Sequence, residues 1–285
     1  MGDRQGIMLA SPYTQGKLER WFKQLTQKGV PAFAFGQRKL NGERAVWTGD
    51  TLISSEGNEI TGVPHIVDSL KKNFRGRCLD GEAYCHGLSL QQIHSIVSRG
   101  SGRLHQNYLA IELHAFDMPL SALEVAQYKR LAYMYEERER FERADFVRLE
   151  ETVRLSSHAQ AFAAVNQYLE EGYEGLIVRH PLGVYAPMSR AVMMKWKPKE
   201  EDEYEIVQVI EGQGKCEGMV GSFVVKDKEG RTFHVGSLKV DMYERKALWE
   251  IRNSLIGKMC KVRYVALSDN GKPPSSTFIS LVEGL

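Results

Sequence analysis

The sequence contains few cysteines, no long apolar run and almost no net charge. Only four of its 285 residues are cysteines, and none of them forms a Cys-x-x-Cys pair. This scatter predicts neither a local zinc site nor a disulfide framework, so we interpret all four as free thiols. Nowhere do ~18 apolar residues follow one another, and residues 1–10 lack the apolar run of a secretory signal. We therefore expect a soluble, cytoplasmic protein without a membrane partner.

The net charge of +2 gives no sign of a partner either. A protein can nevertheless bind a polyanion through a local basic face, because the positions of lysine and arginine matter more than their number. The length of the chain, with 42% hydrophobic residues, is enough for two modest hydrophobic cores.

The first part of the chain alternates between helical and strand patterns. Apolar residues at helical spacing predict a helix over residues 14–27, and Ser-x-x-Gln patterns at Ser89 and Ser157 predict two further helix starts. Strand-like segments occur between these helices, at residues 32–35, 45–47, 109–116, 175–179 and 193–196. This alternation predicts a sheet with mixed strand directions and helices beside it.

The pattern changes after the charged segment Lys197–Glu203, which we interpret as a hinge. Beyond it, short β-rich runs separated by glycine-rich turns, with one helix-like piece at residues 243–253, predict a small barrel such as an OB-fold. We thus expect an α+β protein, with a mixed-sheet domain over residues 1–198 followed by a small β-barrel domain over residues 199–285.

Five short blocks of polar or charged residues occur in a fixed order, each at the end of a predicted strand or in the adjoining loop. One such block alone is a weak indication, since an isolated Lys-x-Asn-Gly segment is usually an ordinary turn. The blocks are Arg38–Arg44, which contains Lys-x-Asn-Gly-x-Arg, then Asp80-Gly81-Glu82, Phe116-Asp117, Glu174–Arg179 and Lys195-Trp196-Lys197.

Together the blocks resemble the motifs of the covalent nucleotidyltransferases, and the first is close to the Lys-x-Asp-Gly-x-Arg signature of ATP-dependent DNA ligases. The resemblance covers nearly the whole chain. It is strongest to the minimal bacterial and viral ligases, which have only a nucleotidyltransferase (adenylylation) domain and an OB-fold domain. It implies ATP and Mg²⁺ as cofactors, with Mn²⁺ as a possible substitute, and nicked duplex DNA as the partner of a monomeric enzyme.

Lys39 is the candidate nucleophile. A lysine amine must lose its proton before it attacks phosphorus, and burial or nearby positive charge favours that loss. We expect the positive charge to come from Arg38, Lys195, Lys197 and a metal ion. The resemblance implies that Lys39 forms lysyl-AMP, that AMP passes to the 5′-phosphate of a nick, and that attack by the 3′-hydroxyl then releases AMP.

Other residues of the blocks are candidates for catalysis and for binding the nucleotide. Gly42 allows a tight turn beside the nucleophile, and the planar fork of Arg44 suits a phosphate or ribose. The resemblance assigns to Arg44 both the nucleotide and the DNA 5′-phosphate, and it makes Phe116 the ring that stacks on adenine. Lys195 and Lys197 share one face of a predicted strand, where the α-phosphate would offset their mutual repulsion.

Two glutamates are candidates for holding a metal ion. Glu82 and Glu174 each stand in a glycine-flanked block beside an apolar strand. Two carboxylates that converge on one site can hold Mg²⁺ against a triphosphate. The resemblance implies that Glu82 contacts the ribose or the metal and that Glu174 is a metal ligand. Arg179 and Arg190 are further candidates for contacts with DNA or nucleotide phosphates.

Three features depart from the family pattern. Asn41 stands where the family has an aspartate, and Ser55 stands where an arginine would grip the 5′-phosphate. Residues 274–281 lack the basic motif that in many relatives orients pyrophosphate, which leaves Lys272 as a substitute and as a DNA-binding candidate. These departures keep two alternatives open: an RNA ligase or RNA-capping guanylyltransferase of the same superfamily, and a non-catalytic nucleic-acid-binding relative.

Overall fold

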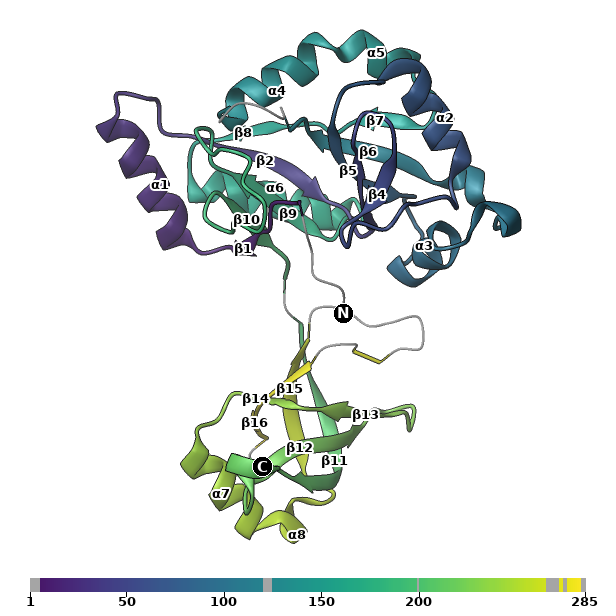
Figure 1. Ribbon diagram of the computed structural model, residues 1–285. Coiled ribbons are helices and arrows are strands. Elements are labelled where there is room, and N and C mark those ends of the chain that lie inside the picture. The colour runs from purple at the N-terminus through teal and green to yellow at the C-terminus, as the bar shows by residue number, and fades with distance from the viewer. Residues whose placement is uncertain (1–5, 120–124, 199, 265–271, 274–275, 283–285) are drawn as a thin grey trace. The chain divides into compact units, whose positions relative to one another are not determined.

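The computed structural model describes residues 6–119, 125–198, 200–264, 272–273 and 276–282, and the chain divides into two compact units (Figure 1). Unit 1 is Met1–Lys197 and unit 2 is Pro198–Leu285. Each unit has its own sheets and its own hydrophobic core.

Unit 1 contains ten strands in two sheets among its described residues. The strands are β1 (Ser11–Pro12), β2 (Ala34–Lys39), β3 (Glu43–Trp47), β4 (Leu52–Ser54), β5 (Leu79–Tyr84), β6 (Glu112–Asp117), β7 (Val147–Leu149), β8 (Val153–Leu155), β9 (Gly175–Arg179) and β10 (Met193–Trp196). Sheet A has the order β1-β10-β9-β2-β8, and sheet B has the order β4-β3-β5-β6-β7. Neighbouring strands are antiparallel except β1–β10 and β6–β7, so both sheets are mixed, as predicted.

Helices pack against both sheets of unit 1. They are α1 (Gln15–Gln27), α2 (Pro64–Asn73), α3 (Leu90–Val97), α4 (Gln127–Glu136), α5 (Arg138–Arg143) and α6 (His158–Glu170). The side chains of Thr14, Ser89 and Ser157 each accept a backbone hydrogen bond in the first turn of a helix, which confirms the three predicted helix starts. The strand predicted at 109–116 begins only at Glu112, because Tyr108–Ala110 forms a short 3₁₀ turn.

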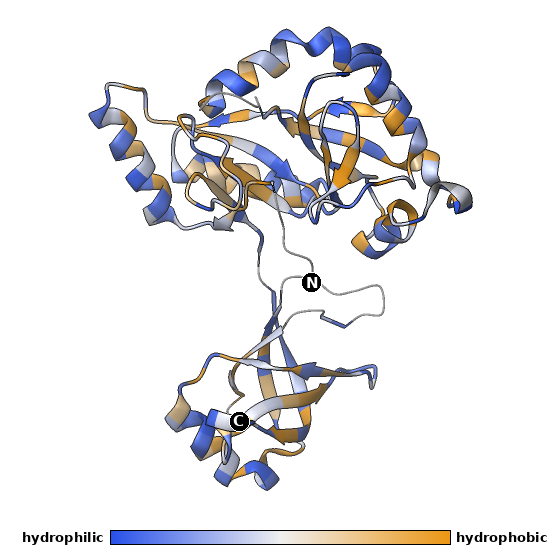
Figure 2. Cartoon of the chain, in the orientation of Figure 1, coloured by the Kyte–Doolittle hydropathy of each residue, from blue (hydrophilic) through white to orange (hydrophobic). Residues whose placement is uncertain are grey.

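Apolar side chains form two cores in unit 1. One lies between sheet A, α1 and α6, and the other lies between sheet B and helices α2 to α5. Figure 2 shows this as hydrophobic colour along the strands and hydrophilic colour on the outer sides of the helices. Trp47 on β3 is fully buried in the second core, and its indole N–H donates to the Phe74 carbonyl at 2.9 Å.

The described residues of unit 2 form a six-stranded sheet with two short α-helices. Its strands are β11 (Glu200–Glu211), β12 (Val220–Lys226), β13 (Thr232–Val235), β14 (Ser237–Leu238), β15 (Met259–Tyr264) and β16 (Ser276–Leu281), and its helices are α7 (Met242–Glu250) and α8 (Arg252–Leu255). The strand order is β13-β12-β11-β15-β16-β14. Its core includes Phe223 and Phe278, whose ring centroids are 4.7 Å apart.

Strand β11 begins earlier than the sequence predicted. Residues 200–203 were expected to belong to a hinge, but they pair with β15, and Glu203 lies opposite Lys261. The Nε of Arg263 donates to the Glu201 carboxylate at 2.5 Å. Opposite charges on neighbouring strands stabilise this extension, which a pattern of apolar residues cannot indicate. Lys199 lies outside the described residues.

Within the described ranges, no helix is both long enough and apolar enough to cross a membrane.

Replacing Trp47 by alanine should destabilise the protein by about 3–5 kcal/mol, because it opens a cavity and removes one of the two hydrogen bonds that the Phe74 carbonyl accepts. Leu109, whose side chain is 52% exposed, provides a matched control. Leu109→Ala should change the free energy of unfolding by less than about 0.5 kcal/mol. Urea denaturation followed by circular dichroism measures both, and equal losses would contradict the predicted packing.

Candidate active site

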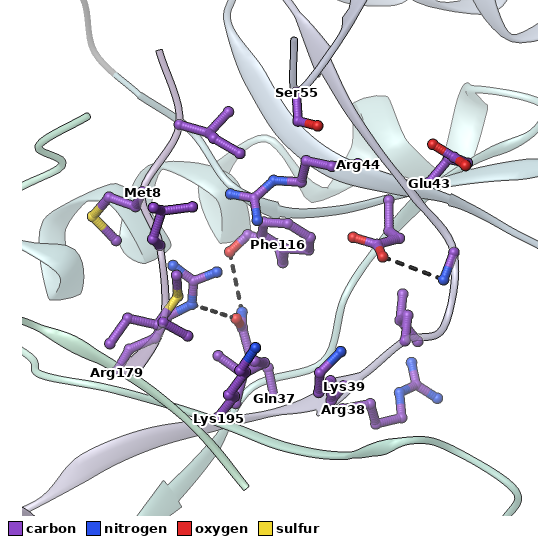
Figure 3. A pocket seen from close by; sticks show the side chains of 18 of the residues that line it. Met8, Gln37, Arg38, Lys39, Glu43, Arg44, Ser55, Phe116, Arg179 and Lys195 are labelled. Carbon is purple, nitrogen blue, oxygen red and sulfur yellow. Dashed lines mark hydrogen bonds between the residues drawn. The ribbon is translucent and has the colours of Figure 1, made fainter. Parts of the chain in front are cut away.

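A cavity of about 400 Å³ lies in unit 1 and is lined by strands of both sheets. Figure 3 shows Lys39 and Lys195 on the side of sheet A, facing Arg44 and Phe116 from sheet B. The segment that precedes β1 adds Met8 to the lining. Residues far apart in the sequence therefore meet at one concave site, which is the usual setting for a small-molecule ligand.

The ammonium group of Lys39 contacts the carboxylate of Glu174, and that of Lys197 contacts the same carboxylate through its other oxygen. Lys39 ends β2, and the backbone N–H of Glu174 donates to the Lys39 carbonyl at 2.9 Å. β10 is the next strand after β9 in sheet A, so the chain brings Lys197 to the same point. One carboxylate thus holds two cations beside the cavity.

Glu82 lies on β5 and lines the cavity. Its carboxylate accepts the backbone N–H of Gly42 at 3.2 Å. Burial raises the pKa of Glu82 to about 7, although Arg44, Lys39 and the Gly42 N–H each favour the ionised form. Gly42 was expected to permit a tight turn, and it stands at a bend between β2 and β3. A Cβ there would also collide with the Ala83 carbonyl, so glycine lets the loop approach β5.

Arg44 is held in a fixed orientation. Its Nε and Nη2 donate to the two carboxylate oxygens of Asp80 at 2.6 and 2.5 Å, and the Tyr185 hydroxyl donates to the same carboxylate at 2.7 Å. The guanidinium carbon lies 4.7 Å from the centroid of the Phe116 ring, a favourable cation–π distance. A bidentate pair of this kind fixes the plane of a guanidinium group at the cavity wall.

Arg179 also lines the cavity, but it is only 2% exposed. Its Nε donates to Gln37 at 2.7 Å and its Nη1 donates to Asp117 at 3.1 Å, while its guanidinium carbon lies 5.1 Å from the Phe116 ring centroid. A side chain at this depth is poorly placed for the contact with duplex DNA suggested by the sequence. Arg179 is instead placed to contact a ligand that enters the cavity.

Arg38 was expected to add positive charge near Lys39, but its charge is matched by a buried carboxylate. Its Nε and Nη2 donate to Glu150 at 2.5 and 3.1 Å, and Glu150 is 1% exposed. Its Nη1 donates to the Tyr173 hydroxyl at 2.9 Å. The sequence analysis missed Glu150, because nothing in the charged stretch around it distinguishes it from a surface glutamate.

The remaining candidates lie at different places. Lys195 is exposed and lines the cavity, and so does the partly buried Ser55. Arg190 is exposed in the connection between β9 and β10, where its carbonyl accepts from Lys17 at 3.0 Å, and it is not among the cavity residues. Lys272 is a partly exposed residue of unit 2.

The described residues contain no group of three or more His, Cys, Asp or Glu side chains arranged to hold a metal ion. Mg²⁺ commonly binds through one or two carboxylates together with substrate phosphates, so two glutamates suffice for the expected site. Glu82 and Glu174 offer such oxygen ligands, and they lie close enough for Glu174 to contribute to the raised pKa of Glu82. Their donor chemistry fits a hard divalent cation.

His114 links the Glu150 carboxylate to a surface ion pair. Its Nδ1 lies 3.3 Å from Glu150, and its Nε2 lies 3.7 Å from Glu112, which also accepts two hydrogen bonds from Arg148. The contact with His114 and then the hydrogen bonds from Arg148 lower the pKa of Glu112 to about 2 against its desolvation. Burial lowers the pKa of His114, but Glu112 and Glu150 outweigh that effect and the net shift is upward.

The stability contributed by Glu112 should therefore depend on pH. A carboxyl group whose pKa is lowered by folding stabilises the fold at pH values above its pKa in the unfolded chain, and this effect is lost as the pH falls towards about 2. A histidine whose pKa is raised by folding stabilises the fold only while it is protonated. Glu112→Gln should cost about 1 kcal/mol near pH 5 to 6, less above pH 8 and least near pH 2, given that the side chain is partly exposed. Thermal unfolding across this range measures the difference, and a cost independent of pH would refute the assignment.

The chain matches two protein-family models. Residues 7–197 match the ATP dependent DNA ligase domain, and residues 211–281 match the DNA ligase OB-like domain. A DNA ligase of Haemophilus influenzae is 23% identical over 273 residues, which are 95% of this chain and 90% of that protein. A DNA ligase of African swine fever virus is 29% identical over 255 residues, which are 81% of this chain but 59% of the viral protein.

Solved structures give the same fold. A structure from a study of Lig E DNA ligases, described as DNA binding with a minimal scaffold, matches with a TM-score of 0.76 at 23% identity and covers 99% of this chain and 100% of that one. The ATP-dependent DNA ligase of bacteriophage T7, in complex with ATP, matches with a TM-score of 0.56 at 15% identity over 97% of this chain and 98% of that one. The mixed-sheet domain and the OB-like domain expected from the sequence are confirmed. Because the ligase-domain model matches about two thirds of its length, this chain belongs to the family of ATP-dependent DNA ligases.

Proposed function

We propose that this chain seals nicks in duplex DNA through a lysyl-AMP intermediate on Lys39. The observation that carries the proposal is the shared carboxylate of Glu174, which holds the ammonium groups of Lys39 and Lys197 beside a cavity also lined by Arg44 and Lys195. A lysine amine beside a carboxylate that can take its proton, at a cavity lined by further cations, suits attack on a phosphate anion.

The two units have different functions in this proposal. Residues 1–198 are the adenylylation domain, because every residue that lines the cavity lies within them. Residues 199–285 are the OB-fold domain, which supports binding of the DNA substrate. We also propose that the chain acts as a monomer. A cytoplasmic location is proposed because four scattered cysteines without a pairing pattern favour a reducing compartment.

In the first step the amine nitrogen of Lys39 attacks the α-phosphorus of ATP. A nitrogen–phosphorus bond forms, the bond from phosphorus to the bridging oxygen breaks, and pyrophosphate leaves with that electron pair. The Glu174 carboxylate contacts the lysine ammonium and is the nearest acceptor for its proton. Arg44, Lys195 and Lys197 stabilise charge on the phosphate oxygens, which is the main requirement in phosphoryl transfer.

The nucleobase and ribose are held by the cavity walls. The Phe116 ring stacks on adenine, and Glu82 is placed to contact the ribose or the metal ion. Glu82 and Glu174 would hold Mg²⁺, with Mn²⁺ as a substitute, together with the ATP phosphates. When bound, the ion neutralises phosphate charge and polarises the reacting phosphorus.

Two further transfers complete the reaction. The 5′-phosphate of the nick attacks the lysyl-AMP phosphorus and frees the Lys39 amine, and the 3′-hydroxyl then attacks the 5′-phosphorus and releases AMP. Arg44 is proposed to contact the 5′-phosphate, and Arg190 and Lys272 are proposed to contact DNA because both have solvent access. Ser55 stands where the family has a second residue that contacts the 5′-phosphate, an arginine, so Arg44 provides more of that contact.

The nucleophile can be tested by incubating the protein with α-labelled ATP and Mg²⁺. The wild type should acquire an acid-labile label, and Lys39→Ala should acquire none because the attacking nitrogen is gone. Lys23, an exposed lysine on α1, gives the matched control. Lys23→Ala should label like the wild type, and label retained by Lys39→Ala would refute the mechanism.

The substrate class can be tested by offering matched nicks. We expect sealing of nicked duplex DNA with ATP to exceed sealing of RNA-bridged nicks, and to exceed the reaction with GTP, by more than about tenfold. Faster joining of RNA would favour an RNA ligase, and labelling by GTP would favour a guanylyltransferase. Normal nick affinity without AMP transfer would identify a non-catalytic relative.

A further inference from the structure

Arg38 connects the two chain segments that carry Lys39 and Glu174. It immediately precedes Lys39, and its Nη1 donates to the hydroxyl of Tyr173, which immediately precedes Glu174, at 2.9 Å. The guanidinium carbon also lies 4.9 Å from the centroid of the Tyr173 ring. The Arg38–Tyr173 contact therefore joins the same two chain segments as the Lys39–Glu174 contact, one residue earlier in each segment.

The other edge of Arg38 is fixed to the connection between the two sheets. Its partner Glu150 lies in the connection that leaves β7 of sheet B and enters β8 of sheet A. The backbone N–H of Glu150 donates to the Ala115 carbonyl on β6 at 2.8 Å, directly before Phe116. Because Glu150 is almost fully buried, its position is set by packing, and the ion pair transmits that position to β2.

We propose that Arg38 is a positioning residue which, through Glu150 and Tyr173, holds the Lys39 amine at the place where it meets the α-phosphate. The inference rests on the proposed function and adds a residue to it. Arg38 does not act through its charge, because Nε, Nη1 and Nη2 are all engaged and the buried carboxylate of Glu150 matches that charge.

The two halves of the ligation reaction separate positioning from general structural support. Formation of lysyl-AMP needs the Lys39 amine in line with phosphorus, whereas sealing of a nick that already carries AMP joins a 3′-hydroxyl to a 5′-phosphate and makes no bond to Lys39. A displacement of about 1 Å can slow an aligned reaction by about 100-fold. Loss of Arg38 should therefore affect the first reaction selectively.

The test compares single-turnover lysyl-AMP formation with sealing of a pre-adenylylated nick, for the wild type and Arg38→Met. We expect the first rate at saturating ATP to fall by about 10- to 100-fold with little change in the ATP concentration at half-maximal rate. The second rate should fall by less than about threefold. Equal losses in both reactions, or no loss in the first, would overturn the proposal.

Two further variants guard against a folding defect. Arg38→Met leaves Glu150 buried without its partner, so the double variant Arg38→Met/Glu150→Met replaces the pair by apolar groups of similar size. It should regain the thermal stability of the wild type but keep the slow first reaction. If it also regains the rate, the role of Arg38 is only structural and the proposal fails.

Tyr173→Phe, which keeps the ring, should slow only the first reaction by several-fold, and an unchanged rate would count against the Tyr173 contact.

The same experiment distinguishes failure of the inference from failure of the function. A wild type that forms no lysyl-AMP would refute the proposed function and with it any role for Arg38. A wild type that forms it, with Arg38→Met equally fast, would refute the positioning role alone.

Discussion

The carboxylate of Glu174 is the point on which the candidate site depends. It binds the ammonium groups of Lys39 and Lys197, which come from opposite ends of unit 1 in sequence. The contact requires β2, β9 and β10 to lie very close together. Gly175 makes this possible: it adopts φ +143°, and a Cβ there would collide with the Trp196 carbonyl. A larger residue would push β10, and Lys197 with it, away from the nucleophile.

Five of the cations in or beside the cavity are each oriented by a carboxylate that the fold supplies. The pairs are Lys39 and Lys197 with Glu174, Arg44 with Asp80, Arg38 with Glu150, and Arg179 with Asp117. The side chains are therefore held before any ligand arrives, which lowers the reorganisation needed when a polyphosphate binds. Buried carboxylates such as Asp80 and Glu150 would be costly without these partners, so stability and site geometry depend on the same contacts.

Much of the fold could be predicted because its determinants are local. Helix starts at Thr14, Ser89 and Ser157 follow from side chains that cap their own first turn, and strands β9 and β10 follow from short apolar runs. The prediction failed where local structure depends on more than the local pattern of apolar residues. Residues 200–203 are strand rather than hinge because β15 supplies opposite charges. The strand expected at 109–116 begins later because a short turn precedes it, and periodicity does not reveal that turn.

The sequence by itself determined the family and the set of chemical groups, because the order of the five blocks is preserved in the linear chain. It named Lys39, Arg44, Glu82, Glu174 and Lys197 without any geometry. Only the tertiary structure decided what each group contacts. It showed that Arg38 forms an ion pair with Glu150, that Arg179 is buried against Phe116, and that Gly42 also permits a close approach to β5. The physical reason is that charge pairing and burial depend on residues distant in sequence, which a local motif cannot specify.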